Sequence, residues 1–301
     1  MNSTKTVKSS PPQFLSVILA VYNAAKTIHE QLEALKAQIY EGEWEIIIVN
    51  NCSTDNTIEV VQAYQVQMPH LHLVHAMEKQ GRAYACNVGA QSARGDALIF
   101  CDADDIVTPG WLPALAKALE TYEVVAGALD LETLNQAAPQ RPPAYLDART
   151  PILDFLPYAV GCNFGVSRQA FEAVGGYSEE FVKGQDVDIS WRLQLHGYPI
   201  GDAPEAIVRY RYRETLWGVW KQFMKIGYFQ TLTYVRFAPY GMPRSSIRKT
   251  LQRYKKLLKP KRVARVLLRR ASRPEQARWV WEAAIYFGRL WGSIRHRTLY
   301  L

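Results

Sequence analysis

From residue 14 onward, the chain alternates short, uninterrupted apolar runs with longer segments whose apolar residues recur at helical spacing. The runs FLSVILAV, EIIIV, LHLV and DALIF are separated by segments such as TIHEQLEALKAQ, TIEVVQAYQVQ and RAYACNVGAQSA. Strands that are buried on both faces read as continuous apolar runs, and helical segments between them are typical of parallel strands joined by crossovers. The pattern up to about residue 128 therefore predicts an α/β fold with a doubly wound, mostly parallel sheet flanked by helices.

Polar residues follow each of the apolar runs. They are Tyr22 and Asn23, then residues 50–55, 78–82 and 102–105. In open parallel sheets, ligands bind beyond the carboxyl ends of the strands. We therefore expect these groups to meet along one edge of the sheet and to form a binding site.

The fourth apolar run ends in DADD, which contains Asp102, Asp104 and Asp105. Like charges this close disfavour joint ionisation unless a cation lies among them, and carboxylate oxygens suit magnesium or manganese. Asp102 and Asp104 are two residues apart, so on a strand they share a face. The alternative is a solvated acidic loop before a helix that begins with Thr108 as its cap and Pro109 at its first position.

The composition changes near residue 241. Residues 241–301 contain 17 Lys and Arg but only two acidic residues, Glu275 and Glu282, whereas the rest of the chain is net acidic. Apolar residues recur at steps of three or four among the basic ones, as in IRKTLQRYKKL, which predicts a basic amphipathic helix. Such a tail suits an anionic membrane surface. Helices packed on the main domain with a charged outer face, or RNA binding, are the alternatives.

Few features of the sequence bear on where the protein acts. Residues 1–13 lack the apolar core of a secretory signal, and we expect them to form a flexible N-terminus. No stretch reaches the roughly 18 apolar residues that a membrane-spanning helix requires. The four cysteines form no CxxC pair, which favours a reducing compartment. We therefore expect a cytoplasmic protein, either in solution or peripheral on the cytoplasmic face of the membrane.

Four segments, in chain order, resemble the motifs of glycosyltransferase family 2, whose members have the nucleotide-sugar-binding fold called GT-A. They are SVILAVYNAAKTI, EIIIVNNCSTDNT, GRAYACNVGAQSARGDALIFCDADD and GVSRQAFEAVGGYSEEFVKGQDVDISWRLQLHGY. The resemblance runs over about residues 15–212. It implies a GT-A glycosyltransferase domain at 14–240, with a nucleotide-binding part at about 14–128 and an acceptor-side part at about 150–240. The basic amphipathic helical tail at 241–301 would follow as a C-terminal extension.

The resemblance also assigns roles on the donor side. Asp104 would coordinate a divalent metal, magnesium or manganese, and Asp102 would support that metal or contact the ribose. Such a metal neutralises charge on the departing nucleoside diphosphate. The other implied donor-side residues are Tyr22, packing near the base, Asn51 and Asp55, in polar contact with the nucleoside, and Arg82 and Asn87, lining the donor site. The alternative for Asn51 and Asp55 is a turn that caps the following helix. The resemblance favours a UDP-sugar as donor and leaves GDP and dTDP open.

On the acceptor side, Asp186 matches the aspartate of the family's Glu-Asp pair, which implies that it is the general base for the acceptor hydroxyl. One base opposite the leaving group implies direct displacement with inversion at the sugar carbon. Gln185 stands where many relatives carry glutamate, and its amide can still bind a sugar hydroxyl. Asp188 is the alternative base, and Asn163 and Trp191 are candidates for the acceptor pocket. The alternative is that Asp186 and Asp188 only begin a helix and favour its dipole, and that Trp191 belongs to the core.

The resemblance therefore implies metal-dependent transfer of a sugar to a glycan or lipid-linked acceptor, in the synthesis of polysaccharide, glycolipid or cell-envelope glycan. Processive synthases carry a downstream Gln-x-x-Arg-Trp element, and the corresponding KQFMKIGY lacks it, so we expect addition of one or a few sugars. A sugar nucleotidyltransferase is an alternative, but AVYNAAKT lacks the glycine-rich loop expected after its first strand. A catalytically inactive, basic adaptor at a membrane surface is the other alternative. We expect no nucleic-acid partner, because no RNA-binding motif is present.

Overall fold

The computed structural model describes residues 11–136, 151–268 and 270–300, which belong to two compact units. The first, here called the sheet unit, comprises Met1–Thr133, Tyr145–Thr150 and Pro157–Arg211. The second, the helical unit, comprises Leu134–Ala144, Pro151–Leu156 and Tyr212–Leu301. Most of the expected flexible N-terminus at residues 1–13 lies outside the described residues, so that expectation stays a prediction.

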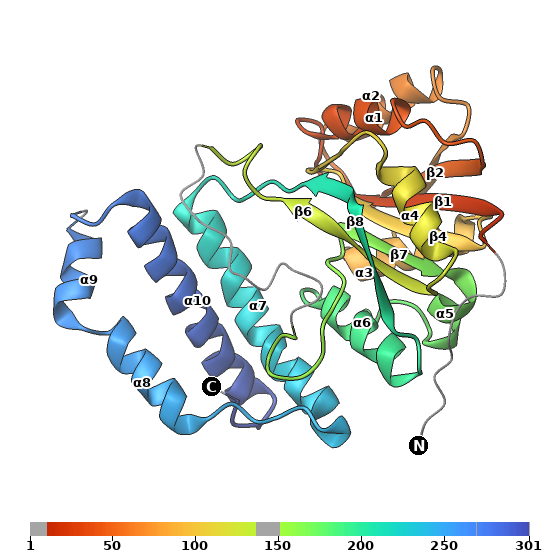
Figure 1. Ribbon diagram of the computed structural model, residues 1–301. Coiled ribbons are helices and arrows are strands. Elements are labelled where there is room, and N and C mark those ends of the chain that lie inside the picture. Colours follow the sequence, from red (N-terminus) through yellow and green to blue (C-terminus); the bar gives the residue numbers. More distant parts are fainter. Residues whose placement is uncertain (1–10, 137–150, 269, 301) are drawn as a thin grey trace. The chain divides into compact units, whose positions relative to one another are not determined.

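One mixed sheet of eight strands runs through the sheet unit, in the order β3-β2-β1-β4-β7-β6-β8-β5 (Figure 1). The strands are β1 (Phe14–Val21), β2 (Glu43–Asn50), β3 (Leu71–His75), β4 (Ala97–Asp102), β5 (Ile106–Val107), β6 (Val124–Asp130), β7 (Asn163–Ser167) and β8 (Ile200–Arg209). The pairs β1–β2, β1–β4, β2–β3 and β6–β8 are parallel, whereas β4–β7, β6–β7 and β5–β8 are antiparallel. The expected α/β sheet is confirmed. The antiparallel pairs were not predicted, because an apolar run does not reveal the direction of its neighbour.

Helices cover both faces of this sheet. They are α1 (Ile28–Lys36), α2 (Thr57–Gln65), α3 (Arg82–Ser92), α4 (Trp111–Leu119), α5 (Arg168–Ala173) and α6 (Gln185–Leu195). Leu15 and Val17 of β1 lie in a core with α1, α2 and α4, whereas Ile18 lies in a second core with α3, α5 and α6. Because successive side chains point to opposite faces, a strand covered on both faces is apolar at almost every position.

The parallel strands β1, β2 and β4 end at the same edge of the sheet. In their registers, Val21 lies opposite Asn50, and Ala20 lies opposite Asp102. Residues that follow these strands are therefore brought to one edge, as their positions in the sequence predicted. The candidate binding site is therefore expected at this edge.

Helix α4 begins at Trp111, so the prediction that Thr108 caps a helix with Pro109 at its first position was wrong. The residue before the helix is Gly110, with φ 82°, and no side chain caps the helix. Both the backbone N–H and the hydroxyl of Thr108 donate to the carbonyl of Ile207, each at 3.0 Å. Pairing with a distant strand thus takes the place of the local cap.

The helical unit contains α7 (Leu216–Phe237), the short 3-10 helix η2 (Ala238–Tyr240), α8 (Ile247–Leu257), α9 (Pro260–Leu267) and α10 (Arg273–Arg295). Helices α7 and α10 lie side by side (Figure 1). A Cβ added to Gly227 would lie 2.2 Å from the Ile285 carbonyl oxygen, and one added to Gly288 would lie 2.2 Å from that of Met224. The two glycines thus permit backbone-to-backbone contact. Because α7 packs on α10, the longest segment of the helical unit begins at Tyr212, before the basic composition starts at residue 241. The functional domain boundaries expected from the sequence stay a prediction.

Candidate functional site

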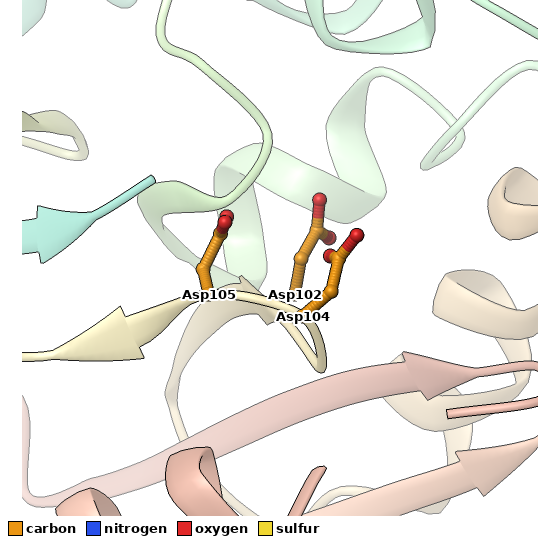
Figure 2. A group of neighbouring side chains, drawn as sticks. All are labelled: Asp102, Asp104 and Asp105. Carbon is orange, nitrogen blue, oxygen red and sulfur yellow. The ribbon is translucent and has the colours of Figure 1, made fainter. Parts of the chain in front are cut away.

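Three aspartates surround the end of β4. Asp102 is the last residue of the strand, and Asp104 and Asp105 lie in the turn that leads to β5. One carboxylate oxygen from each lies within 4.8 Å of the other two. Figure 2 shows the Asp102 and Asp104 side chains close together, with Asp105 beside them. The site predicted at the end of the fourth apolar run thus contains three carboxylates, one more than the pair expected as metal ligands.

Asp105 is the most buried member of the group, with 1% of its surface exposed. Its Oδ1 accepts a hydrogen bond from the Arg211 backbone N–H at 2.8 Å. Its Oδ2 is buried near the Cys162 thiol and has no hydrogen-bond partner at ordinary distance in the described part of the chain. Burial raises the pKa of Asp105 well above its usual range, and the Asp104 and Asp102 carboxylates raise it further. Three carboxylates this close fit a divalent cation with oxygen ligands.

Arg82, the first residue of α3, connects this group to the rest of the site. Its Nε and Nη2 donate to Oδ1 of Asp102 at 2.9 and 2.7 Å, and Nη2 also donates to the Gly161 carbonyl at 2.8 Å. Burial alone would lower the pKa of Arg82, but the Asp102 carboxylate raises it, so the guanidinium stays charged. Its Nη1 is buried and has no partner among the described residues. Arg82 therefore holds Asp102 in place.

Asp186, the second residue of α6, lies on the other side of Gly161. Its Oδ2 accepts from the Gly161 N–H at 3.4 Å, and its Oδ1 accepts from the Val187 N–H at 2.9 Å. A Cβ on Gly161 would lie 3.1 Å from Nη1 of Arg82 and 3.3 Å from Cβ of Asp186. Burial raises the pKa of Asp186, and the charge of Arg82 opposes that shift. The predicted base is thus joined to the acidic group through one loop residue and one arginine.

Gln185 precedes Asp186 and is 5% exposed. Its Oε1 is buried and has no partner among the described residues. An amide oxygen in this state can accept a hydrogen bond from a hydroxyl group. The placement of Gln185 is therefore compatible with the acceptor role expected for it.

The structure corrects the interpretation of three other acceptor-side residues. Asp188, the alternative base, is fully buried and accepts hydrogen bonds from Nε and Nη2 of Arg192 at 2.9 and 2.7 Å. Asn163 is fully buried, and its amide bonds to Trp111 Nε1 and to the carbonyls of Ala128 and Ala206. Trp191 has no exposed surface. Asp188 thus forms a buried ion pair, and Asn163 and Trp191 belong to the core rather than to an accessible pocket.

The residues expected on the donor side differ in their exposure to solvent. Tyr22 follows β1 and exposes 52% of its surface, so its ring is open to a ligand. Asn51 is 4% exposed: its Nδ2 donates to the carbonyls of Ala76 and Lys79, and its Oδ1 accepts from Gly81 N–H at 2.7 Å. The amide of Asn51 thus holds the segment before α3, and its expected contact with a base stays a prediction.

Asp55 and Asn87 also have local partners. Asp55 accepts from the N–H and hydroxyl of Thr57 at the start of α2 and from the Ala25 N–H. Burial pushes the pKa of Asp55 up, but these hydrogen bonds outweigh it and hold the pKa below the usual value. The amide of Asn87 donates to the Tyr177 carbonyl and accepts from the Tyr177 N–H, both at 2.9 Å. Asp55 thus forms the turn that was the alternative interpretation. Asn87 fastens a loop, and its expected role at the donor site stays a prediction.

Two residues of the site were not singled out from the sequence. Arg211 follows β8; its Nε donates to the Asp104 carbonyl at 2.9 Å, and its Nη2 pairs with Glu30 at 2.9 Å. Gly161 lies in the loop before β7 and touches both Arg82 and Asp186. No local pattern marks either residue, because their partners lie far along the chain.

Comparison with known proteins gives a consistent result. A sequence profile described as "Glycosyl transferase family 2" matches residues 16–175. Glycosyltransferase AglE of Haloferax volcanii is 27% identical over 199 residues, which are 64% of this chain and 66% of AglE. The poly-beta-1,6-N-acetyl-D-glucosamine synthase of Staphylococcus aureus is 28% identical over 232 residues, 74% of this chain and 56% of the synthase. Glycosyltransferase GlyG of Streptococcus pneumoniae is 32% identical over 108 residues, 36% of each chain. The chain thus spans 36% to 66% of the length of these relatives.

Solved structures show the same fold. The mannosyltransferase PcManGT from Pyrobaculum calidifontis, in complex with GDP-Man and Mn²⁺, has a TM-score of 0.63 at 17% identity, with 94% of this chain and 88% of that chain covered. Residues 1–349 of TarS from S. aureus, in complex with UDP, have a TM-score of 0.53 at 17% identity, with 95% and 93% covered. The GT-A fold expected from the sequence is confirmed.

Proposed function

Because this chain belongs to glycosyl transferase family 2, we propose that it transfers a sugar from a nucleotide-diphosphate donor to an acceptor hydroxyl with inversion. One observation carries the proposal: Arg82 and Gly161 connect the three-aspartate group at the end of β4 to Asp186. A cation-binding group and a base are thereby adjacent in one compact unit. Transfer of a sugar from a nucleoside diphosphate needs both functions.

For the donor half, Asp102, Asp104 and Asp105 would hold magnesium or manganese. A bound divalent cation supplies Lewis-acid stabilisation of the charge that develops on the nucleoside diphosphate. Arg82 keeps the Asp102 carboxylate oriented. Tyr22 offers an exposed ring for the base. A UDP-sugar is the donor we favour, with GDP and dTDP to be tested beside it, since similar proteins have been crystallised with UDP and with GDP-Man.

For the acceptor half, Asp186 would accept the proton of the attacking hydroxyl. The new bond forms at the anomeric carbon while the bond to the diphosphate oxygen breaks on the opposite side, which inverts that carbon. Gln185 Oε1 would accept a hydrogen bond from another acceptor hydroxyl. The acceptor we propose is a glycan or lipid-linked sugar, in the synthesis of polysaccharide, glycolipid or cell-envelope glycan. We propose addition of one or a few sugars, because KQFMKIGY in α7 lacks the processive element.

Isothermal titration of the full chain with UDP, GDP and dTDP, each with Mn²⁺ and with EDTA, tests the donor half. We expect one nucleotide to bind only with metal, and Asp104→Ala to weaken that binding at least ~10-fold by removing a charged ligand. Glu120→Ala, which removes an exposed carboxylate after α4, is the matched control and should bind like wild type.

Two outcomes would count against the proposal. If no nucleotide binds the wild type with any metal, the inactive adaptor becomes the better account. If the protein instead joins a nucleoside triphosphate to a sugar phosphate and releases pyrophosphate, it is a nucleotidyltransferase.

A further inference from the structure

Helix α10 presents a continuous apolar stripe to solvent. Phe287, Leu290, Trp291 and Ile294 recur at steps of three and four, which places them on one face of the helix. They expose 48%, 41%, 60% and 72% of their surface, respectively. The side of α10 that carries Gly288 contacts α7, so the stripe is not the side that the helix pair buries.

Helix α7 continues this surface with aromatic side chains. The ring of Trp220 lies 5.9 Å from that of Phe287, and the ring of Tyr228 lies 6.0 Å from that of Trp291. Trp217, three residues before Trp220, is 61% exposed. We call the combined surface the aromatic face; it consists of Trp217, Trp220, Tyr228, Phe287, Leu290, Trp291 and Ile294. Monomeric soluble proteins rarely expose a contiguous apolar patch of this kind without a partner.

Exposed cations accompany the aromatic face. Lys221 and Lys225 are exposed one turn apart on α7, and the Lys221 ammonium lies 5.2 Å from the centre of the Trp217 ring. Arg295 and Arg297 are exposed at the end of α10. The sequence of α7 contains no Asp or Glu. These positive charges therefore have no carboxylate partner on α7 itself.

The acidic residues of α10 lie in its first half, away from the stripe. Glu275 pairs with Arg265, and Glu282 pairs with Arg262 and Arg278. The aromatic face thus has an apolar centre with exposed Lys and Arg beside it, and neither α7 nor the second half of α10 adds an acidic residue to it.

We propose that the aromatic face binds an anionic membrane surface. Trp and Tyr rings suit the headgroup level of a bilayer, and nearby Lys and Arg attract anionic lipids, whose charge is concentrated on the cytoplasmic leaflet. Among the described residues, no helix has both the length and the apolar content to cross a bilayer. The helix pair would therefore lie on the membrane with its aromatic side chains in the headgroup layer.

This inference is independent of the proposed sugar transfer, because it uses none of the residues around Asp102 and Asp186. If both hold, the protein works on acceptors at the cytoplasmic face of a membrane. Failure of nucleotide binding would leave the membrane proposal untouched, and the reverse is also true.

Flotation of the full chain with lipid vesicles tests the proposal. We expect the wild type to float with vesicles of equal parts phosphatidylcholine and phosphatidylglycerol, and much less with phosphatidylcholine alone. The triple variant Phe287→Gln, Trp291→Gln, Ile294→Gln should lose at least ~10-fold in vesicle affinity, since it removes the exposed apolar surface. Lys221→Gln with Lys225→Gln should lose roughly fivefold for each cation removed. The matched control, Ile39→Gln with Val66→Gln, removes two side chains of the sheet unit that are 85% and 86% exposed, and should float like wild type.

Three results would overturn the proposal. The first is a wild type that floats with neither vesicle, a result that does not depend on how any variant folds. The second is loss of flotation on changing Leu251 of α8 and Leu258, which follows α8, to Gln while the triple variant floats normally. This result would move the binding to the basic helices. The third is a wild-type dimer by light scattering that the triple variant converts to a monomer without any vesicle binding, which would make a second copy the partner.

Discussion

Asp186 is a partly buried carboxylate whose pKa is raised, chiefly by burial. An acid with a raised folded-state pKa stabilises the fold below its unfolded pKa and loses that contribution as pH rises through the folded pKa. Asp186→Asn should therefore unfold at the same or a higher temperature than wild type at pH 8, while the transfer rate falls ~10²–10⁴-fold. Circular dichroism during heating and nucleotide release measure the two effects. Full activity in the variant would remove Asp186 from the role of base.

The same shift predicts the acid side of the pH–rate profile. The base acts in its ionised form, so kcat/KM should fall on acidification with an apparent pKa above the ordinary aspartate value of about 3.9. The direction follows from burial, which outweighs the opposing charge of Arg82. Steady-state rates across the acid range supply the measurement. An acid limb at the ordinary value would contradict this account of the site.

Asn163 is expected to act on stability alone. Its amide makes three hydrogen bonds, at 2.8 to 2.9 Å, to groups on α4, on β6 and on β8; the bonds to α4 and β8 are buried and the bond to β6 is partly buried. Asn163→Ala leaves these groups unpaired, and each buried unpaired group costs about 1–3 kcal/mol. We expect urea denaturation to show a loss of about 3 kcal/mol or more, with nucleotide affinity unchanged in the folded protein. A weaker nucleotide affinity with normal stability would restore a direct role in binding.

At the scale of elements, the crossing of α7 and α10 depends on glycine. The Cβ of an alanine at position 288 would lie 2.2 Å from the Met224 carbonyl oxygen, so the helices would have to separate. Overpacking of this kind costs about 1–3 kcal/mol. We expect Gly288→Ala to lower the free energy of unfolding by about 1–3 kcal/mol, measured by urea denaturation. Ile294→Ala, at a 72% exposed position of the same helix, is the control and should stay within about 0.5 kcal/mol of wild type.

At the scale of the whole molecule, the two proposals predict that nucleotide binding and membrane binding can be lost independently of each other. A ligand at 100 times its Kd stabilises the state that binds it by about 2.7 kcal/mol, so nucleotide with Mn²⁺ should raise the Tm of the wild type. The triple variant of the aromatic face should keep this shift and lose flotation, whereas Asp104→Ala should lose the shift and still float. Thermal unfolding and flotation on the same preparations provide the comparison. A single variant that abolishes both while remaining folded would argue against two independent sites.

The local sequence determined the elements and the place of the acidic group. Apolar runs and helical spacing identified strands and helices, and the polar residues after parallel strands predicted one edge, where Tyr22 and Asp102 now lie. These features are readable because burial on two faces and the direction of parallel strands leave a pattern within a few residues. The motifs were also sufficient for the family, which the matching profile confirms.

The tertiary structure decided which polar side chains are available for chemistry. Asn51, Asn87, Asn163 and Asp188 have the residue types of a binding site, yet each is bound to backbone groups or to another side chain. Asp105 is held by the backbone N–H of Arg211, and Gly161 joins Arg82 to Asp186, through contacts between distant parts of the chain. Residue type shows what a side chain can bind, but its partners and its exposure depend on segments far along the sequence. That is why the sequence could predict the position of the site and several of its residues, but not which of the other polar residues already have partners within the fold.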